Sequence, residues 1–432
     1  MEGSLRVDGG RITEIGADVR PAPSDEVVDA TGCYVLPGGV DPHCHVMADV
    51  AAAAAGAVQG GTTTLLSFTS PEPGEAPVAA IERARVLVAE AHPVVDVGLH
   101  AACYEPDSLS PEDVEAVAAA GGDAIKCFLA YPELGIMATG GGLFRAMSYA
   151  ARAGLPVQVH CEDGELIEAM VEEASAAGRR HTRTFAEVRP AAAEELAVER
   201  VIAFATITGA RCYLPHLSTR GALESVRRAR LAGGTCEVTA EVCLHHVLLD
   251  DRAYGDERAE ELLVAPPLRD RAEVEAVAAA LADGSVDTVG SDHSQVRTPV
   301  DARIARSPYS TYGIAGAGAR LPLLLAWGLG HGVAMDRLSH LLSAGPAGSF
   351  GYRNKGRLAL GMDGDVVVWD PGGEWTVAAD SFPDGTGTAP YAGRRVTGRV
   401  RSVCLRGRMV VREGELVSTV GAGRIIEPAA RR

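Results

Sequence analysis

The middle of this chain alternates short apolar runs with Ala/Glu/Arg-rich segments of helical character, and no other feature constrains the fold as strongly. Strand–helix units repeated in this way are typical of a parallel sheet whose strands are connected by helices. Eight apolar runs are expected to form strands: 34–39, 62–68, 94–101, 124–129, 156–160, 211–216, 235–239 and 286–290. Eight such units predict an α/β fold of the (β/α)8 TIM-barrel type.

The segments between these runs are rich in residues with high helix propensity. Ser110 precedes Pro111, and this pair is favourable at the N-terminus of a helix. The run 51–55 is nearly all alanine and is expected to form one face of the first barrel helix. Further helices are expected at 111–120, 194–208, 221–232 and 270–282.

The two ends of the chain have a different pattern, in which apolar and polar positions alternate between Gly and Asp turns. The N-terminal end turns at Asp8-Gly9-Gly10, and the C-terminal end has short apolar segments at 365–369, 399–406 and 409–412. Both ends predict short antiparallel strands, and the simplest arrangement joins them in one small β-sandwich. We therefore expect three parts: sandwich at 1–35, barrel at 36–354 and sandwich again at 355–432.

Composition and charge exclude several classes of partner. A net charge of −17 argues against nucleic acid, because proteins that bind phosphate backbones concentrate positive charge. The N-terminal residues have no apolar segment of the kind that a secretory signal needs. The most apolar later stretch, 321–335, is too short and too interrupted to span a bilayer. We expect a soluble cytoplasmic protein with a small-molecule substrate and no membrane contact.

Nine cysteines without a paired CxxC pattern suggest reduced thiols rather than a disulfide framework. Three of them, Cys44, Cys127 and Cys161, each follow a candidate metal ligand. Because side chains alternate along a strand, these thiols should point to the opposite face and pack against helices.

Lysine is nearly absent: Lys and Arg together number 40, but only Lys126 and Lys355 are lysines. Lys126 lies in an apolar run expected to be a buried strand, where desolvation favours the neutral amine. A neutral amine, unlike a guanidinium, can capture CO2 and become a carbamate, which is an anionic metal ligand. The alternative is that Lys126 simply pairs with a carboxylate.

Several metal-binding side chains stand at or just after the ends of the apolar runs. His43 and His45 follow the first run, and a His-x-His pair on extended backbone can direct both rings to one side. Such a pair alone often arises by chance. In a parallel barrel, however, the carboxyl ends of all strands converge on one face. Six candidate ligands would meet there: His43, His45, Lys126, His160, His216 and Asp292.

With these ligands in place, the chain resembles the cyclic amidohydrolases, specifically the hydantoinase, dihydropyrimidinase, allantoinase and dihydroorotase group. The resemblance extends over essentially the whole sequence. Besides the ligands, it rests on the motifs at 36–41 (LPGGVD), 60–63 (GGTT), 265–269 (APPLR), 320–324 (RLPLL), 355–357 (KGR) and 363–365 (DGD).

The resemblance implies a binuclear centre, with zinc as the expected metal. His43, His45 and Asp292 would bind one ion, His160 and His216 the other, and carboxylated Lys126 would bridge the two. Hydroxide between the metals would attack a ring amide carbonyl, and Asp292 would pass its proton to the leaving nitrogen. Tyr131 matches the family tyrosine that stabilises the oxyanion, although it could instead be an aromatic packed at a strand end.

Other histidines have weaker claims. His100, His245 and His246 are expected to be buried polar groups with hydrogen-bond partners rather than ligands. His293, beside Asp292, is a candidate for orienting another group or the substrate. Lys355 is expected to support the structure of the second β unit.

Substrate choice rests on Met47. Dihydroorotases have an arginine at this position and allantoinases an asparagine, whereas a thioether cannot pair with a carboxylate. Met47 therefore favours the hydantoinase and dihydropyrimidinase branch, although 46–60 is shorter than that branch usually has. The alternatives are allantoinase- or dihydroorotase-like activity, the reverse cyclisation of a ureido acid, and a non-enzymatic scaffold. The resemblance also implies a homo-oligomer, either tetramer or dimer.

Overall fold

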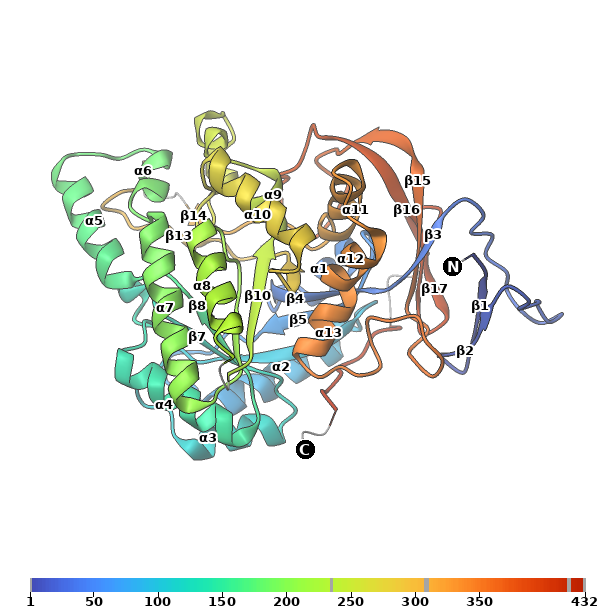
Figure 1. Cartoon of the computed structure of the whole chain (residues 1–432), viewed down its shortest axis with the longest axis horizontal. Coiled ribbons are helices and arrows are strands. Elements are labelled where there is room, and N and C mark those ends of the chain that lie inside the picture. Colours follow the sequence, from blue (N-terminus) through green and yellow to red (C-terminus); the bar gives the residue numbers. More distant parts are fainter. Residues whose placement is uncertain (1, 234–235, 307–310, 418–420, 430–432) are drawn as a thin grey trace.

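The computed structural model describes residues 2–233, 236–306, 311–417 and 421–429. Figure 1 shows a barrel surrounded by helices and, beside it, antiparallel strands from both ends of the chain. The blue N-terminal strands and the red C-terminal strands lie on the same side of the barrel.

Within the described residues, the barrel sheet has nine strand segments, all paired in parallel with their neighbours. β11 pairs with β10, and β12, which begins three residues after β11 ends, pairs with β4. This one segment therefore closes the sheet into a barrel, which confirms the predicted fold. The segments are β4 (Gly39–His45), β5 (Thr62–Phe68), β6 (Asp96–Ala102), β7 (Ile125–Phe128), β8 (Val157–His160), β9 (Cys212–Leu214), β10 (Val238–Cys243), β11 (Thr288–Gly290) and β12 (His293–Ser294).

The first barrel strand begins later than the sequence predicts. The expected strand 34–39 is split: β3 (Tyr34–Pro37) joins the antiparallel sheet, and β4 starts the barrel at Gly39. Gly38 lies at the break, where a Cβ atom would fall 2.1 Å from Thr63 Oγ1. Only glycine fits there, so the chain passes from one sheet to the other at this point. His43 and His45 consequently lie inside a barrel strand rather than after it.

The seventh barrel strand is also shifted. The sequence predicts a strand at 235–239, whereas β10 runs from Val238 to Cys243; Thr235 lies outside the described residues. Glu241 interrupts the apolar pattern in this stretch, so the predicted strand ends too early. The remaining barrel strands agree with the predicted runs to within two residues at nearly every end.

The predicted helices are confirmed with small shifts at their ends. Ser110 caps α3, accepting the N–H of Asp113, while the Asp113 carboxylate accepts the N–H of Ser110 in return. The α-helices are α1 (Val50–Gln59), α2 (Pro77–Ala91), α3 (Pro111–Ala119), α4 (Gly140–Ala153), α5 (Gly164–Ala176), α6 (Thr182–Glu187), α7 (Ala191–Thr208), α8 (Arg220–Leu231), α9 (Leu244–Leu248), α10 (Arg271–Asp283), α11 (Arg320–Gly330), α12 (Met335–Ser339) and α13 (Gly345–Ser349). Three short 3-10 helices are η1 (Pro132–Leu134), η2 (Asp251–Gly255) and η3 (Ala259–Leu262), and η4 (His340–Ala344) is a short π-helix that follows α12. Among the described residues, no helix is long and apolar enough to cross a membrane.

The main hydrophobic core lies between the barrel strands and the helices around them. Cys44, Cys127 and Cys161 are buried in it, on the faces of β4, β7 and the end of β8 that point away from the barrel axis. The predicted core role of these thiols is confirmed. The opposite faces of the same strands carry the candidate ligands.

The antiparallel part draws on both ends of the chain, as predicted. β1 (Ser4–Asp8) and β2 (Arg11–Gly16) form a hairpin that turns at Gly9-Gly10, where both φ angles are positive. β3 pairs with β15 (Val366–Thr376), followed by β16 (Arg395–Leu405), β17 (Arg408–Arg412) and β18 (Glu415–Leu416). β13 (Thr298–Pro299) and β14 (Thr311–Tyr312) form a separate antiparallel pair.

Lys355 joins the barrel to this antiparallel sheet. Its buried ammonium lies 2.5 Å from Asp96 Oδ2, 2.6 Å from Asp365 Oδ2 and 2.9 Å from Asp363 Oδ2. Asp96 begins β6 of the barrel, whereas Asp365 precedes β15 of the sheet. These contacts agree with the structural role predicted for Lys355.

Replacing Lys355 by methionine should destabilise the protein by about 3 kcal/mol, because buried carboxylates would lose their shared cation. The free energy of unfolding from urea titration measures this. Arg395→Met is the control, since its pair with Glu374 is exposed and should contribute little. Equal urea midpoints for the two variants would contradict the role of Lys355.

Candidate metal centre

The six predicted ligands all lie at the carboxyl-terminal end of the barrel. Three of their imidazole rings are in contact: the centroids of His43 and His216 are 5.1 Å apart, and those of His160 and His216 are 4.7 Å apart. The parallel sheet brings them together because every strand ends at this face. The positions are His43 and His45 on β4, Lys126 on β7, His160 at the end of β8, His216 two residues after β9 and Asp292 two residues after β11.

His43, His45 and Asp292 form the tighter group. Asp292 Oδ1 lies 3.1 Å from His43 Nε2 and 3.7 Å from His45 Nε2. One donor atom from each residue falls within 4.8 Å of the other two, a spacing that a single cation can bridge. The donor set, two imidazoles and one carboxylate, suits a borderline divalent metal such as zinc.

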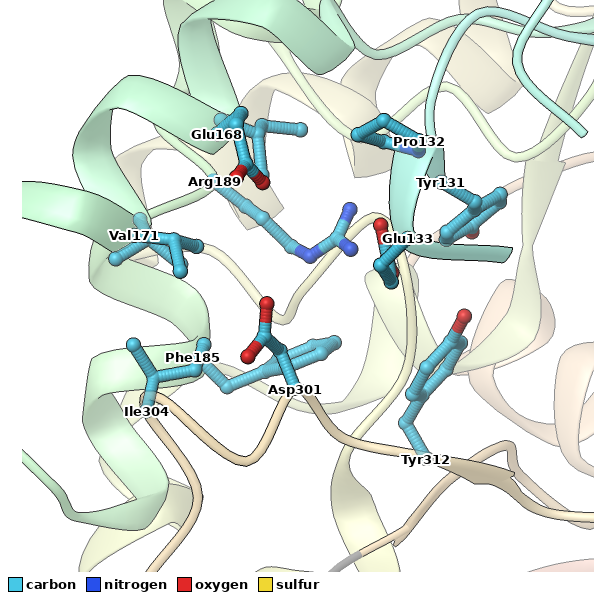
Figure 2. A pocket seen from close by; sticks show the side chains of 12 residues that line it. Tyr131, Pro132, Glu133, Glu168, Val171, Phe185, Arg189, Asp301, Ile304 and Tyr312 are labelled. Carbon is cyan, nitrogen blue, oxygen red and sulfur yellow. The ribbon is translucent and has the colours of Figure 1, made fainter. Parts of the chain in front are cut away.

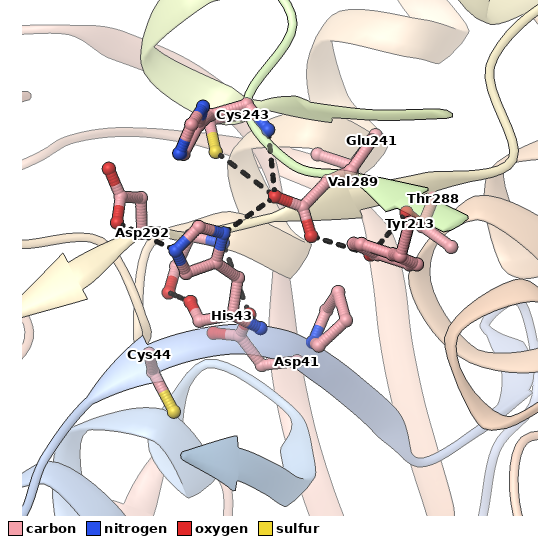
Figure 3. A network of polar contacts seen from close by, with 12 residues as sticks. Asp41, His43, Cys44, Tyr213, Glu241, Cys243, Thr288, Val289 and Asp292 are labelled. Atoms are coloured by element: carbon pink, nitrogen blue, oxygen red, sulfur yellow. Dashed lines mark hydrogen bonds and ion pairs between the residues drawn. The ribbon is translucent and has the colours of Figure 1, made fainter. Parts of the chain in front are cut away.

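Glu241 on β10 fixes this group in place, and sequence reasoning missed it. Its Oε1 accepts a hydrogen bond from His43 Nδ1 at 2.9 Å and from the backbone N–H of His216 at 3.1 Å. Its Oε2 accepts the Tyr213 hydroxyl, which in turn accepts from Thr288 (Figure 3). Because His43 Nδ1 donates to Glu241, Nε2 is left to face Asp292 and the candidate metal site. The available signal was a lone acidic residue inside an apolar run.

A second carboxylate supports His160 in the same manner. Glu162 Oε2 lies 2.8 Å from His160 Nε2 and 2.7 Å from Arg189 Nη1. The other ring nitrogen, Nδ1, faces the Tyr131 hydroxyl at 3.4 Å. Neither Glu162 nor Arg189 was singled out from the sequence, although Glu162 follows His160 by two residues.

Lys126 is buried among aromatic rings. Its Nζ lies 4.8 Å from the centroid of Phe68 and 5.4 Å from that of Phe128, and within the described residues no ion pair joins it to a carboxylate. Burial lowers the pKa of Lys126 to about 8, although the more distant charges of Asp292 and Glu241 oppose this. The alternative of a simple ion pair has no carboxylate partner at contact distance among the described residues. The Lys126 amine therefore loses its proton more readily than that of an exposed lysine.

The negative charges around His43 favour a proton on its ring when no metal is bound. Burial disfavours that proton, but the charges of Asp292 and Glu241 outweigh burial and raise the pKa of His43 to about 9. Burial would likewise raise the pKa of Asp292, yet the neighbouring His43 holds it well below its ordinary value. A positive charge at this point is thus strongly favoured, and a metal ion can replace the proton.

Three of the six non-glycine residues with positive φ among the described residues belong to the centre. Tyr131, His216 and Asp292 all have positive φ angles, of 70°, 44° and 49°. Residues other than glycine rarely adopt this conformation, and functional sites are where such strain persists. Each of these residues stands just after a barrel strand, where the turned backbone aims its side chain at the site.

A small pocket borders the centre at Tyr131 (Figure 2). The ring of Tyr131 stacks against Tyr312, with centroids 6.0 Å apart. Burial raises the pKa of the Tyr131 phenol well above its ordinary value, so the hydroxyl remains a donor at neutral pH. The pocket walls include Glu133, Phe185 and Arg189.

The other histidines considered in the sequence differ in their hydrogen bonding. His100 has partners on both ring nitrogens, Asp123 and the Pro42 carbonyl, as predicted. The same prediction is wrong for His245: neither ring nitrogen has a partner among the described residues, and the ring packs edge-on against His246 with centroids 4.2 Å apart.

Of the candidate substrate contacts, Met47 stands two residues after β4, and His293 begins β12, which pairs with β4. Met47 is partly buried and packs against the main core. His293 is fully buried on β12, and its Nδ1 accepts the Gly316 N–H at 3.2 Å. Their roles toward substrate stay predictions.

A sequence model described as the amidohydrolase family matches residues 34–410. The chain belongs to the amidohydrolase family. Among curated relatives, this amidohydrolase is 31% identical to a D-hydantoinase of Streptomyces coelicolor over 98% of the chain and 94% of the relative. It is 33% identical to an allantoinase of Rubrobacter xylanophilus over 98% of the chain and 93% of the relative. The predicted resemblance to this group is confirmed.

Solved structures agree with the sequence relatives. The dihydropyrimidinase from Brevibacillus agri superposes with a TM-score of 0.91 at 30% identity, covering 99% of this chain and 95% of that one. A D-hydantoinase superposes with a TM-score of 0.91 at 28% identity, covering 98% and 94%. The whole fold of this amidohydrolase, barrel and antiparallel sheet together, is therefore that of hydantoinase and dihydropyrimidinase structures.

In the metal-free protein, the His43 imidazole should titrate near pH 9. Glu241→Gln should lower that pKa, because removing a negative charge makes the protonated ring less favourable. Histidine NMR titration measures both, with His43→Asn identifying the signal. Glu162→Gln is the control, since Glu162 contacts His160 instead. A His43 pKa at or below 6.5 in the wild-type protein would contradict this electrostatic picture.

Proposed function

We propose that this amidohydrolase opens the ring amide bond of a cyclic ureide or imide at a centre of two divalent metal ions. The observation that carries the proposal is the convergence of two imidazoles and a carboxylate beside a buried lysine that has no carboxylate partner among the described residues. Packing alone gives no reason to gather these groups at one end of a barrel. This also argues against a non-enzymatic scaffold.

The described residues fit such a centre. His43, His45 and Asp292 would hold the first ion, and His160 and His216 the second. Lys126, as a carbamate formed with CO2, would be shared between the two. Zinc is the expected metal, because the donors are imidazole and oxygen. When bound, the ions would supply a nucleophilic water at neutral pH and polarise the ring carbonyl.

The protein groups then have defined tasks in hydrolysis. Asp292, whose carboxylate stays ionised, accepts the proton of the attacking water and delivers it to the leaving ring nitrogen. The Tyr131 hydroxyl donates a hydrogen bond to the oxyanion that develops on the carbonyl. The reverse reaction, cyclisation of a ureido acid, uses the same groups in the opposite order.

Hydantoins and dihydropyrimidines are the substrates favoured by Met47, whose thioether offers no pairing for a substrate carboxylate. The D-hydantoinase and dihydropyrimidinase relatives support the same choice. Allantoin is the second candidate, because an allantoinase is also among the relatives at 33% identity. We further propose a homo-oligomer, tetramer or dimer, on the basis of family resemblance.

The zinc-loaded protein should hydrolyse hydantoin, 5-substituted hydantoins or dihydrouracil in preference to allantoin and dihydroorotate. Ring opening can be measured as the loss of substrate absorbance and confirmed by mass spectrometry of the ureido acid. Preferred turnover of allantoin would replace the leading substrate with the second candidate. No turnover across the panel by protein with two bound metals would contradict both choices.

Lys126→Arg should keep the fold but lose metal, because arginine retains the positive charge and cannot form the carbamate. Metal content by mass spectrometry should fall from two ions per chain in the wild-type protein to one or none. Circular dichroism provides the control for folding. Wild-type metal content in a folded Lys126→Arg protein would show that the carbamate is not required.

A further inference from the structure

The hydrogen bonds behind His160 continue from its partner Glu162 to Arg189. His160 Nε2 and Arg189 Nη1 both donate to the same oxygen, Oε2 of Glu162. With its proton on Nε2, the imidazole presents the lone pair of Nδ1 to the centre. The orientation of His160 thus depends on where Glu162 is held, and Glu162 is held by Arg189.

Arg189 is itself held firmly. It lies between α6 and α7, its N–H donates to the Ala186 carbonyl at 3.1 Å, and its own carbonyl accepts from Arg269 Nη1. The start of α7 is tied to the end of β8, because Asp163 N–H donates to the Ala193 carbonyl at 2.9 Å. The guanidinium is therefore positioned by the backbone that surrounds the His160 loop.

The same guanidinium also contacts Tyr131. It lies 5.4 Å from the ring centroid of Tyr131 and 4.9 Å from that of Phe185, and it is almost fully buried. Figure 2 shows it reaching into the middle of the pocket beside Tyr131. One cation thus contacts both the carboxylate behind His160 and the aromatic ring that carries the candidate oxyanion donor.

Glu162 has little else to compensate its charge. Its second oxygen, Oε1, is buried and has no hydrogen-bond partner among the described residues. Without Arg189, a buried carboxylate would keep His160 as its direct partner and lose its paired cation, which is strongly unfavourable. Glu162 would then shift or bind a different group, and His160 would shift with it.

We propose that Arg189 is a positioning residue for the second metal position: through Glu162 it sets the orientation of His160, and through its ring contact it sets that of Tyr131. This inference rests on the proposed two-metal function. Arg189 acts on His160 only through Glu162.

The test is zinc binding by Arg189→Gln, measured by competition with a chromophoric chelator. Of the two wild-type sites, one should weaken by about 10- to 100-fold, as expected for loss of an outer-sphere partner, while the other is unchanged. Arg200→Gln is the matched control. Arg200 lies on α7 and pairs with Asp163, the neighbour of Glu162, at 2.7 Å, but contacts neither Glu162 nor His160.

A double-mutant cycle with Glu162→Gln separates positioning from general destabilisation. The amide introduced by Glu162→Gln still offers an oxygen to His160 but needs no cation, so Arg189→Gln should have little further effect on zinc affinity in that background. Additive losses would overturn the proposal, as would full affinity at both sites in the single Arg189→Gln variant. If Arg189→Gln does not fold, Arg189→Lys takes its place in the same cycle. Wild-type protein that binds fewer than two zinc ions would instead overturn the proposed function.

Discussion

The parallel pairing of β12 with β4 is the contact on which the rest of the site depends. It sets His293 opposite Cys44 and closes the barrel. Asp292, at the turn between β11 and β12, is thereby brought within 3.1 Å of His43, although the two are far apart in sequence. The pairing that closes the barrel therefore also assembles the group of His43, His45 and Asp292. In an open sheet, Asp292 would lie at one edge, and His43 and His45 would lie near the other.

Compensated buried charge is the second organising principle. Glu241 serves His43, Glu162 is shared by His160 and Arg189, and Lys355 is surrounded by three aspartates. Each of these charges is buried together with its partner, as a low-dielectric interior requires. Lys126 is the exception among the described residues, since its close neighbours are aromatic rings. The only two lysines of this arginine-rich chain thus have opposite surroundings. Lys126 lies among aromatic rings, and Lys355 lies among three aspartates.

Much of the fold could be predicted from the sequence because strands and helices have distinct periodicities. The apolar runs located the barrel strands, and the ends of three runs located His160, His216 and Asp292. The errors have local physical causes: Gly38 breaks the first run by a steric requirement, and Glu241 disrupts the apolar signal of β10. Glu241 was missed because a single Glu in an apolar run has no spacing pattern that distinguishes it. Glu162 was missed because it stands next to Asp163 and near Glu165, and nothing in the sequence sets it apart from these acidic neighbours. His245 was misjudged because hydrogen-bond partners depend on neighbours distant in the chain.

The sequence by itself determined the barrel, the family and the set of candidate ligands, since each follows from residue type and periodicity along the chain. Only the tertiary structure decided how those ligands are held. Glu241 joins His43 to the backbone of His216, Arg189 reaches Glu162 from another loop, and Lys126 is left without a carboxylate among the described residues. Such relationships depend on which side chains meet across the barrel. They are set by strand order and closure, which no local pattern of residues contains.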